Sequence, residues 1–219
     1  MTMPSMCKKV VCFDLDDTLY KEIDFVESAY GEIASFVGAP KIVPMMMKWF
    51  HDGDNVFQKL NQYTGQEKSM AEYLTIYRNH VPNISLLEGV EETLDELTHR
   101  GVILGLITDG RSISQRNKIK ALGLERWFKD KNIIISEEFG SEKTDERNFR
   151  CFMDLYPGCK YYYVGDNPKK DFMVPNYLLW ETIMLKDNGS NIHEQILEVA
   201  SDLLSQYKID FLKDILYLI

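Results

Sequence analysis

Four polar residues follow the first apolar run of the chain. Val10 to Phe13 predict a buried strand, and directly after it come Asp14, Asp16, Asp17 and Thr18. Because side chains alternate along an extended chain, Asp14 and Asp16 can face the same space while Leu15 points into the packing. Two carboxylates held this close need a counter-charge, and Mg²⁺ is a hard cation that keeps both ionised. The alternative reading is a polar turn or helix cap after a core strand.

Other polar residues stand where later strands are expected to end. Thr108, Asp109 and Gly110 follow the apolar run 102–107, and Asp166 follows the run 161–164. Two further candidates lie in the connections, namely Lys143 in the loop after a strand at 132–136 and Asp171 in a short helix that starts near Pro168. Each has a plainer explanation as a cap, turn or surface residue. Their joint occurrence at strand ends favours one shared site.

Such a site could transfer a phosphoryl group. Four acids would repel a phosphate dianion, so Mg²⁺ and Lys143 are needed to offset their charge. A carboxylate can attack phosphorus and form an aspartyl-phosphate, and Asp14 is the candidate nucleophile. Asp16 could protonate the leaving oxygen and later deprotonate the attacking water, as general acid and then general base.

The elements that must position these residues alternate between strands and helices from residue 86 onward. Amphipathic helices are expected at 89–100, 112–122 and 145–156, between apolar strands. This alternation predicts an α/β fold, a doubly wound parallel sheet of Rossmann-like topology covered on both faces. Ligands of such sheets bind beyond the carboxyl ends of the strands. The tail, 192–219, is expected to be mostly helical, with a short edge strand near Leu203.

Residues 20–83 contain no convincing strand. Four helices are expected there, at about 23–37, 42–50, 56–63 and 67–79. A connection of about sixty residues is far longer than a compact loop, so we interpret it as an inserted α-helical cap subdomain. The catalytic core then comprises 1–19 and 84–219. Methionine and aromatic side chains of the insertion could line a substrate pocket or form the core of the helical bundle.

Composition excludes several classes of protein. The chain has 219 residues and a net charge of −9, which argues against a nucleic-acid polymer as partner but allows a small phosphate ester held by local cations. The four cysteines form no CxxC pair, which favours a reducing cytoplasm. We see no signal-peptide core and no apolar run long enough to span a membrane. The oligomeric state is left open.

The motifs together resemble the haloacid dehalogenase (HAD) superfamily, in particular its capped phosphatases. Asp14 to Thr18 looks like the first motif, which implies that Asp14 is nucleophile and metal ligand and that Asp16 is acid/base and offers its main-chain carbonyl to Mg²⁺. Thr108 is similar to the second motif, a phosphate-binding hydroxyl with the N–H groups of Asp109 and Gly110 close by. Three residues match the third and fourth motifs: Lys143 as phosphate-binding lysine, Asp166 as metal ligand, and Asp171 orienting water or Lys143.

Two positions depart from the family pattern. Asp109 stands where many relatives have asparagine, and Thr144 stands where proline usually follows the lysine. The stretches GLITDG and ALGLERWF look most like nucleotidase-type relatives, and phosphoglycolate phosphatases share the capped arrangement. The resemblance therefore implies a phosphatase for a small phosphomonoester, such as a nucleoside monophosphate or a sugar phosphate.

Two rival functions are open at this point. A phosphomutase of the same superfamily would pass the phosphoryl group from the aspartate to a second hydroxyl of a sugar. A signalling receiver domain would gather acids, a threonine and a lysine around Mg²⁺ and act as a switch. The long helical insertion and the spacing of Asp14 and Asp16 favour the enzyme over the receiver.

Overall fold

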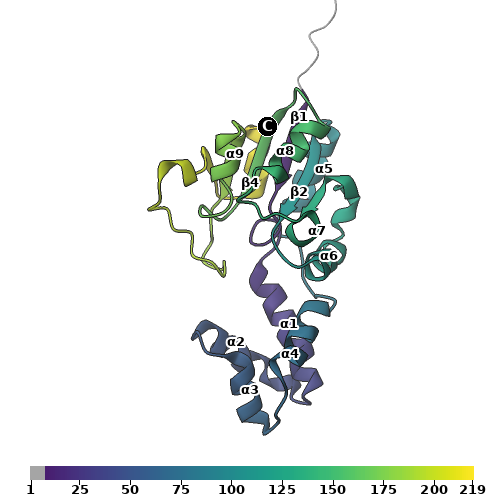
Figure 1. The fold of residues 1–219 in the computed structure, drawn as a ribbon, viewed down its shortest axis with the longest axis vertical. Helices are drawn as coiled ribbons and strands as arrows, with labels where there is room; N and C mark the ends of the chain where they lie inside the picture. The colour runs from purple at the N-terminus through teal and green to yellow at the C-terminus, as the bar shows by residue number, and fades with distance from the viewer. Residues whose placement is uncertain (1–7) are drawn as a thin grey trace, which may run out of the picture.

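A computed structural model describes residues 8–219 of the chain. Its larger part is built around a six-stranded parallel sheet with the order β3-β2-β1-β4-β5-β6. The sheet lies in the upper part of Figure 1. The strands are β1 (Lys9–Phe13), β2 (Ile103–Thr108), β3 (Ile133–Ile135), β4 (Lys160–Gly165), β5 (Glu181–Leu185) and β6 (Tyr207–Ile209). The order reverses between β1 and β4, which is where ligands of doubly wound sheets bind. The predicted α/β fold class is confirmed.

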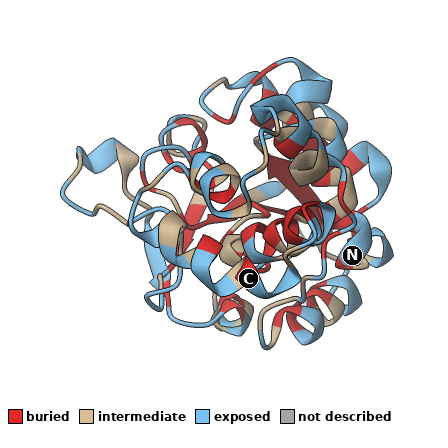
Figure 2. Cartoon of the chain, turned by 90° about the horizontal axis from the view of Figure 1, so that it is seen from below, coloured by how far each residue is buried: buried red, intermediate tan, exposed pale blue. Residues whose placement is uncertain are grey.

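Helices cover both faces of the sheet. They are α5 (Val90–His99), α6 (Ser112–Ala121), α7 (Ser136–Phe139), α8 (Arg147–Leu155) and α9 (Met173–Tyr177). The four helices of the insertion lie apart from the sheet (Figure 1) and are described below. Alternate side chains of β1 define the two cores, because Val11 and Phe13 pack with residues of α5 and α6, whereas Val10 and Cys12 pack with residues of α8 and α9. Figure 2 shows the buried residues on the strands and on the inner sides of the helices.

The insertion is a separate group of helices below the sheet (Figure 1). It consists of α1 (Glu22–Phe36), α2 (Val43–His51), α3 (Val56–Thr64) and α4 (Met70–Asn79), as the spacing of apolar residues predicts. These helices have a hydrophobic cluster of their own, in which Met46 and Tyr73 are fully buried. The start of α4 was expected near residue 67, but Ser69 and Glu72 form a reciprocal capping box that begins the helix at Met70.

The prediction of a mostly helical tail was wrong. Residues 192–219 contain β6 and two short 3-10 helices, Ser201–Leu203 and Leu212–Tyr217, within otherwise irregular chain. The edge strand lies beyond Leu203, where it pairs in parallel with β5. Pairing satisfies the free edge of β5, and Leu212 and Ile215 then bury their side chains in the sheet core. Tertiary contacts have overridden helix propensity here.

Two expectations concern residues at or near the N-terminus. Cys7 and most of the N-terminal stretch 1–9, on which the signal-peptide prediction rests, lie outside the described residues. Within residues 8–219, Cys12 and Cys151 carry free thiols, and Cys12 is fully buried. In the same part of the chain, no helix combines the length and apolar character needed to cross a membrane.

Candidate active site

Three neighbouring strands deliver functional side chains to one edge of the sheet. Asp14 follows β1, Thr108 is the last residue of β2, and Asp166 follows β4. The sheet order places β1 between β2 and β4, so the three side chains meet although they lie far apart in the sequence. The N–H of Asp14 donates to the carbonyl of Val164 over 2.8 Å, which continues the β1–β4 pairing up to the site.

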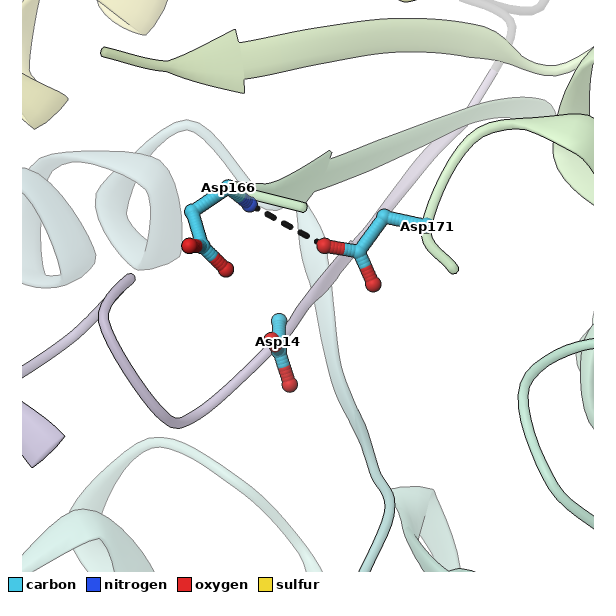
Figure 3. Close-up of side chains that lie close together, drawn as sticks. All are labelled: Asp14, Asp166 and Asp171. Carbon is cyan, nitrogen blue, oxygen red and sulfur yellow. Dashed lines mark hydrogen bonds between the residues drawn. The ribbon is translucent and has the colours of Figure 1, made fainter. Parts of the chain in front are cut away.

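Three buried carboxylates lie together at this edge (Figure 3). Asp14, Asp166 and Asp171 each offer an oxygen atom within 4.8 Å of the others, and their exposed fractions are 5%, 4% and 0%. We call these residues the acid cluster. The ammonium of Lys143 lies 2.8 Å from Oδ1 of Asp14 and 2.8 Å from Oδ1 of Asp171. One lysine thus faces three acids.

Asp171 lies in the turn before α9 and not on a helix that starts near Pro168, as was predicted. Its carboxylate explains the turn, because Oδ2 accepts the N–H groups of Asp166 over 3.1 Å and Asn167 over 2.8 Å. These two bonds hold the chain in a turn at Asp166 and Asn167 before α9 begins. Oδ1 accepts from Lys143, so both oxygens of Asp171 are already occupied.

Electrostatics set the acid cluster apart from ordinary carboxylates. Burial raises the pKa of Asp14 to about 8 against the opposing effect of Lys143, and it raises the pKa of Asp166 to about 9 with a further increase from Asp171. Burial alone would lower the pKa of Lys143, but Asp14 and Asp171 hold it well above its usual value. If all three acids were ionised, the cluster would carry more negative charge than Lys143 can offset, which is why the pKa values of Asp14 and Asp166 are raised.

The carboxylate of Asp16 is held by three donors outside the acid cluster. Lys118 donates to Oδ1 over 2.7 Å, Tyr20 donates to the same oxygen, and Gln115 donates to Oδ2 over 2.9 Å. Burial would raise the pKa of Asp16, but the charge of Lys118 and these hydrogen bonds outweigh burial and lower it. This arrangement therefore favours the ionised form of Asp16.

The segment after β2 adopts a well-bonded turn. Thr108 is 1% exposed and its hydroxyl accepts from Nε2 of Gln115 over 2.6 Å. The carboxylate of Asp109 accepts the N–H of Lys143 over 3.0 Å, and the N–H of Gly110 donates to the hydroxyl of Ser136 over 2.9 Å. The first bond ties the second motif to the loop that carries Lys143. The second means that the Gly110 donor is already paired.

Several polar residues at the site were not predicted from the sequence. Tyr20, Gln115 and Lys118 surround Asp16, and Asn191 donates to Oδ2 of Asp166 over 2.9 Å. The sequence carries one signal for two of them, because Gln115 and Lys118 occupy helix positions where apolar spacing calls for hydrophobic residues. Asn191 lies in a loop and has no comparable signal.

This combination of fold and site defines a class of hydrolases. Residues 11–175 match the family described as haloacid dehalogenase-like hydrolase, and the chain belongs to this family. Glyceraldehyde 3-phosphate phosphatase from Methanocaldococcus jannaschii is 29% identical over 230 residues, which cover 94% of this chain and 95% of that protein. Phosphoserine phosphatase from Thermus thermophilus is 33% identical over 125 residues, which cover 54% of this chain and 48% of that protein. The chain is therefore an enzyme, a hydrolase of the phosphatase type.

Solved structures show the same fold. YfnB from Bacillus subtilis, a HAD-hydrolase bound to magnesium, superimposes with a TM-score of 0.70 at 19% identity and covers 97% of this chain and 99% of its own. A 2-haloacid dehalogenase from Pseudomonas syringae pv. Tomato gives a TM-score of 0.63 at 20% identity, with 96% and 97% covered. At these identities the likeness shows the fold, a Rossmann-like core with an inserted helical subdomain.

Proposed function

We propose that this hydrolase is a Mg²⁺-dependent phosphatase that releases inorganic phosphate from a small phosphomonoester through an aspartyl-phosphate. The observation that carries the proposal is the acid cluster with Lys143 at the carboxyl ends of β1 and β4. Nucleoside monophosphates and sugar phosphates are the substrate classes that we propose. The curated relatives, named for glyceraldehyde 3-phosphate and phosphoserine, support a small phosphorylated substrate.

The donors of the acid cluster fit Mg²⁺. They are buried oxygen atoms with too little positive charge nearby, and Mg²⁺ prefers carboxylate oxygen ligands. We assign the ion to the carboxylates of Asp14 and Asp166 and to the main-chain carbonyl of Asp16. Asp171 serves instead to hold Lys143, because its two oxygens already accept hydrogen bonds. When bound, the ion neutralises charge on the phosphate oxygens.

Asp14 is the proposed nucleophile. Its Oδ1 accepts from the N–H of Leu15 and lies beside Lys143, and the hydrogen bonds within residues 8–219 leave Oδ2 free to attack phosphorus. The bond between phosphorus and the leaving oxygen breaks as the bond to Oδ2 forms. Thr108 and Lys143 bind phosphate oxygens, and the main chain at Asp109 and Gly110 shapes the loop around them.

Asp16 is the proposed general acid and base. It donates a proton to the leaving oxygen in the first step and takes a proton from water in the second, when the aspartyl-phosphate is hydrolysed. The lowered pKa of Asp16 favours its ionised form, which suits the second step. The first step requires that Asp16 gain a proton before the leaving group departs.

The helical insertion, residues 20–83, is the proposed cap over a core of residues 1–19 and 84–219. A separate hydrophobic cluster supports its independence, and closure over the sheet edge would exclude water from the reaction. The free thiols of Cys12 and Cys151 support our proposal of a reducing, cytoplasmic compartment.

A panel of phosphomonoesters tests this function. Purified enzyme should release inorganic phosphate from at least one small ester with Mg²⁺ and lose this activity with a chelator, which excess Mg²⁺ restores. Asp14→Asn should abolish turnover in the same assay. Turnover that persists in chelator, or its absence across the whole panel, would contradict the proposal. Isomerised sugar phosphate without free phosphate would indicate a mutase instead.

A further inference from the structure

The buried side of α6 is unusually polar. Ser114, Gln115 and Lys118 are 8%, 2% and 4% exposed, and Ile119 is the apolar residue that accompanies them. Buried polar groups cost free energy unless each finds a partner. Ser114 donates to the carbonyl of Arg78 at the end of α4, but Gln115 and Lys118 both turn toward Asp16. Packing alone does not explain this choice of residues.

Lys118 forms an ion pair with Asp16 and lies against two aromatic rings. Its ammonium lies 2.7 Å from Oδ1 of Asp16, 4.3 Å from the ring centre of Phe25 and 5.8 Å from that of Tyr20. The hydroxyl of Tyr20 donates to the same oxygen of Asp16. The rings shield the pair from water, so one face of the Asp16 carboxylate is fixed by two donors.

Gln115 connects Asp16 to the phosphate-binding hydroxyl. Its Nε2 donates to Oδ2 of Asp16 over 2.9 Å and to Oγ1 of Thr108 over 2.6 Å. Because Oγ1 accepts this bond, the proton of the Thr108 hydroxyl is directed away from Gln115 and can be donated to a phosphate oxygen. One amide therefore fixes two functional side chains relative to each other.

Resting on the proposed phosphatase function, we propose that Gln115 and Lys118 are positioning residues of the reaction. They hold the Asp16 carboxylate next to Thr108, where the leaving oxygen of a bound phosphate ester must lie. Both act through Asp16 and Thr108, and neither forms or breaks a bond in the reaction. Proton transfer requires donor and acceptor within about 3 Å, so a carboxylate released from these contacts transfers its proton less efficiently.

The test compares two esters of similar shape. Phenyl phosphate has a poor leaving group that needs a proton, whereas 4-nitrophenyl phosphate has a good one. Lys118→Met preserves the length of the aliphatic chain against Phe25 and removes the ammonium. We expect kcat/KM to fall about 10- to 100-fold for phenyl phosphate and less than about 3-fold for 4-nitrophenyl phosphate, as a partial loss of general acid catalysis.

Gln115→Leu should give the same dependence on the leaving group and should also raise KM for both esters, because Thr108 loses its orienting bond. The matched control is Lys120→Met, which makes the same chemical change at an exposed position of α6. We expect its kinetics to equal those of the unsubstituted enzyme. Circular dichroism and thermal unfolding establish that each variant is folded.

A double-mutant comparison separates positioning from a structural role. In an Asp16→Asn background, Lys118→Met should cost less than about 2-fold in kcat/KM, because the group that it positions is gone. Equal losses for both esters, or a full additional loss in this background, would overturn the inference. If Lys118→Met does not fold, Lys118→Arg carries the same comparison with a displaced cation and the same criteria. An unsubstituted enzyme without any turnover would refute the proposed function itself.

Discussion

Asp109 directs its carboxylate at the main chain of Lys143 and not at the expected phosphate position. This contact explains how aspartate can replace the asparagine of many relatives, because the side chains of both residues offer an oxygen that accepts a hydrogen bond. It also fixes the loop around Lys143, which carries Thr144 in place of the usual proline. Asp109, whose negative charge looked unsuitable beside a phosphate, therefore stabilises the loop that carries Lys143.

Substitutions at Asp109 should distinguish the effect of its hydrogen-bond acceptor from the effect of its negative charge. Asp109→Asn keeps an oxygen that can accept from Lys143 and removes a negative charge near the phosphate, so we expect an equal or lower KM with kcat within about 3-fold. Asp109→Ala loses a partly buried hydrogen bond and should reduce kcat by about 10-fold, the effect of about 1–1.5 kcal/mol on the loop. Steady-state kinetics on one ester measures both. Equal loss in the two variants would mean that the charge itself is required.

Asp16→Asn should slow turnover of poor leaving groups by about 10²–10⁴-fold, because general acid–base catalysis is lost. Activated aryl phosphates should still transfer phosphate to Asp14, but hydrolysis of the intermediate would lack its base. Intact-protein mass spectrometry should then detect a phosphorylated protein. The control is Asp14→Asn combined with Asp16→Asn, which should show no added mass. A uniform rate loss with no trapped intermediate would contradict the acid/base role.

At the scale of elements, Gly105 of β2 lies where neighbouring side chains approach the backbone closely. A Cβ atom there would lie 2.4 Å from Phe152 and 2.6 Å from the sulfur of Cys12. The neighbouring strand and α8 thus pack directly on the backbone of β2. Sequence periodicity marks this residue as part of a strand but does not reveal which side chains from other elements cover it.

Gly105→Ala should destabilise the protein by about 1–3 kcal/mol, because these contacts leave no space for a methyl group. For a chain of this size, that corresponds to a Tm lower by roughly 2–12 °C. Gly31→Ala is the matched control, since Gly31 lies in α1 and a Cβ atom there meets nothing within 4 Å. Alanine in a helix should leave stability unchanged or higher by up to about 1 kcal/mol. Similar unfolding temperatures for both variants would contradict this account of the packing.

The spacing of apolar residues predicted most helices and strands. It failed where contacts with distant parts of the chain determine the local structure. Apolar spacing located α1 to α4 and the strands, because each element buries one side along its own length. The prediction of a helical tail failed because residues of the tail pair with the free edge of β5 and form the strand β6. Asp171 was misplaced because its carboxylate caps a turn formed by Asp166 and Asn167, a contact that no helical period encodes.

At the scale of the whole molecule, the sequence indicated which strand ends would meet but not what surrounds them. Asp14, Thr108 and Asp166 follow from the rule that parallel strands present their carboxyl ends at one edge. The partners of Asp16 on α6 depend on how that helix docks against the start of α1. This docking depends on contacts between segments far apart in the sequence, so neither Gln115 nor Lys118 was identified.

The acid cluster makes the stability of the whole protein depend on pH and Mg²⁺. Burial raises the pKa of Asp14 to about 8 and that of Asp166 to about 9, from an ordinary value of 3.8. Between about pH 4 and pH 8 the metal-free folded protein therefore binds more protons than the unfolded chain, and its free energy of unfolding falls as pH rises. Mg²⁺ binds the ionised carboxylates, so its stabilising effect should increase over the same range.

Thermal unfolding in chelator and in Mg²⁺ measures this effect. At pH 8 and a Mg²⁺ concentration of about 100 times Kd, we expect a stabilisation of about 2.7 kcal/mol, or a rise in Tm of roughly 5–10 °C. The rise should be smaller at pH 5.5, where protons compete for the same oxygens. Asp166→Asn should reduce the rise at both values of pH. An equal rise at pH 5.5 and pH 8 in the unsubstituted protein would contradict the assignment of the ion to these acids.

The position of β1 also affects the order in which the molecule is assembled. It is the first strand of the described chain, yet it lies in the middle of the sheet, and its register pairs Lys9 with Lys160 of β4. During synthesis β1 emerges long before β4, so the edge of β1 that pairs with β4 stays unpaired until then. Meanwhile α1 to α4 can already pack around their own hydrophobic cluster. The acids that follow β1 and β4 come together only after this long-range pairing. In a nascent chain the acid cluster is therefore assembled at a late stage of folding, when the surrounding scaffold is nearly complete.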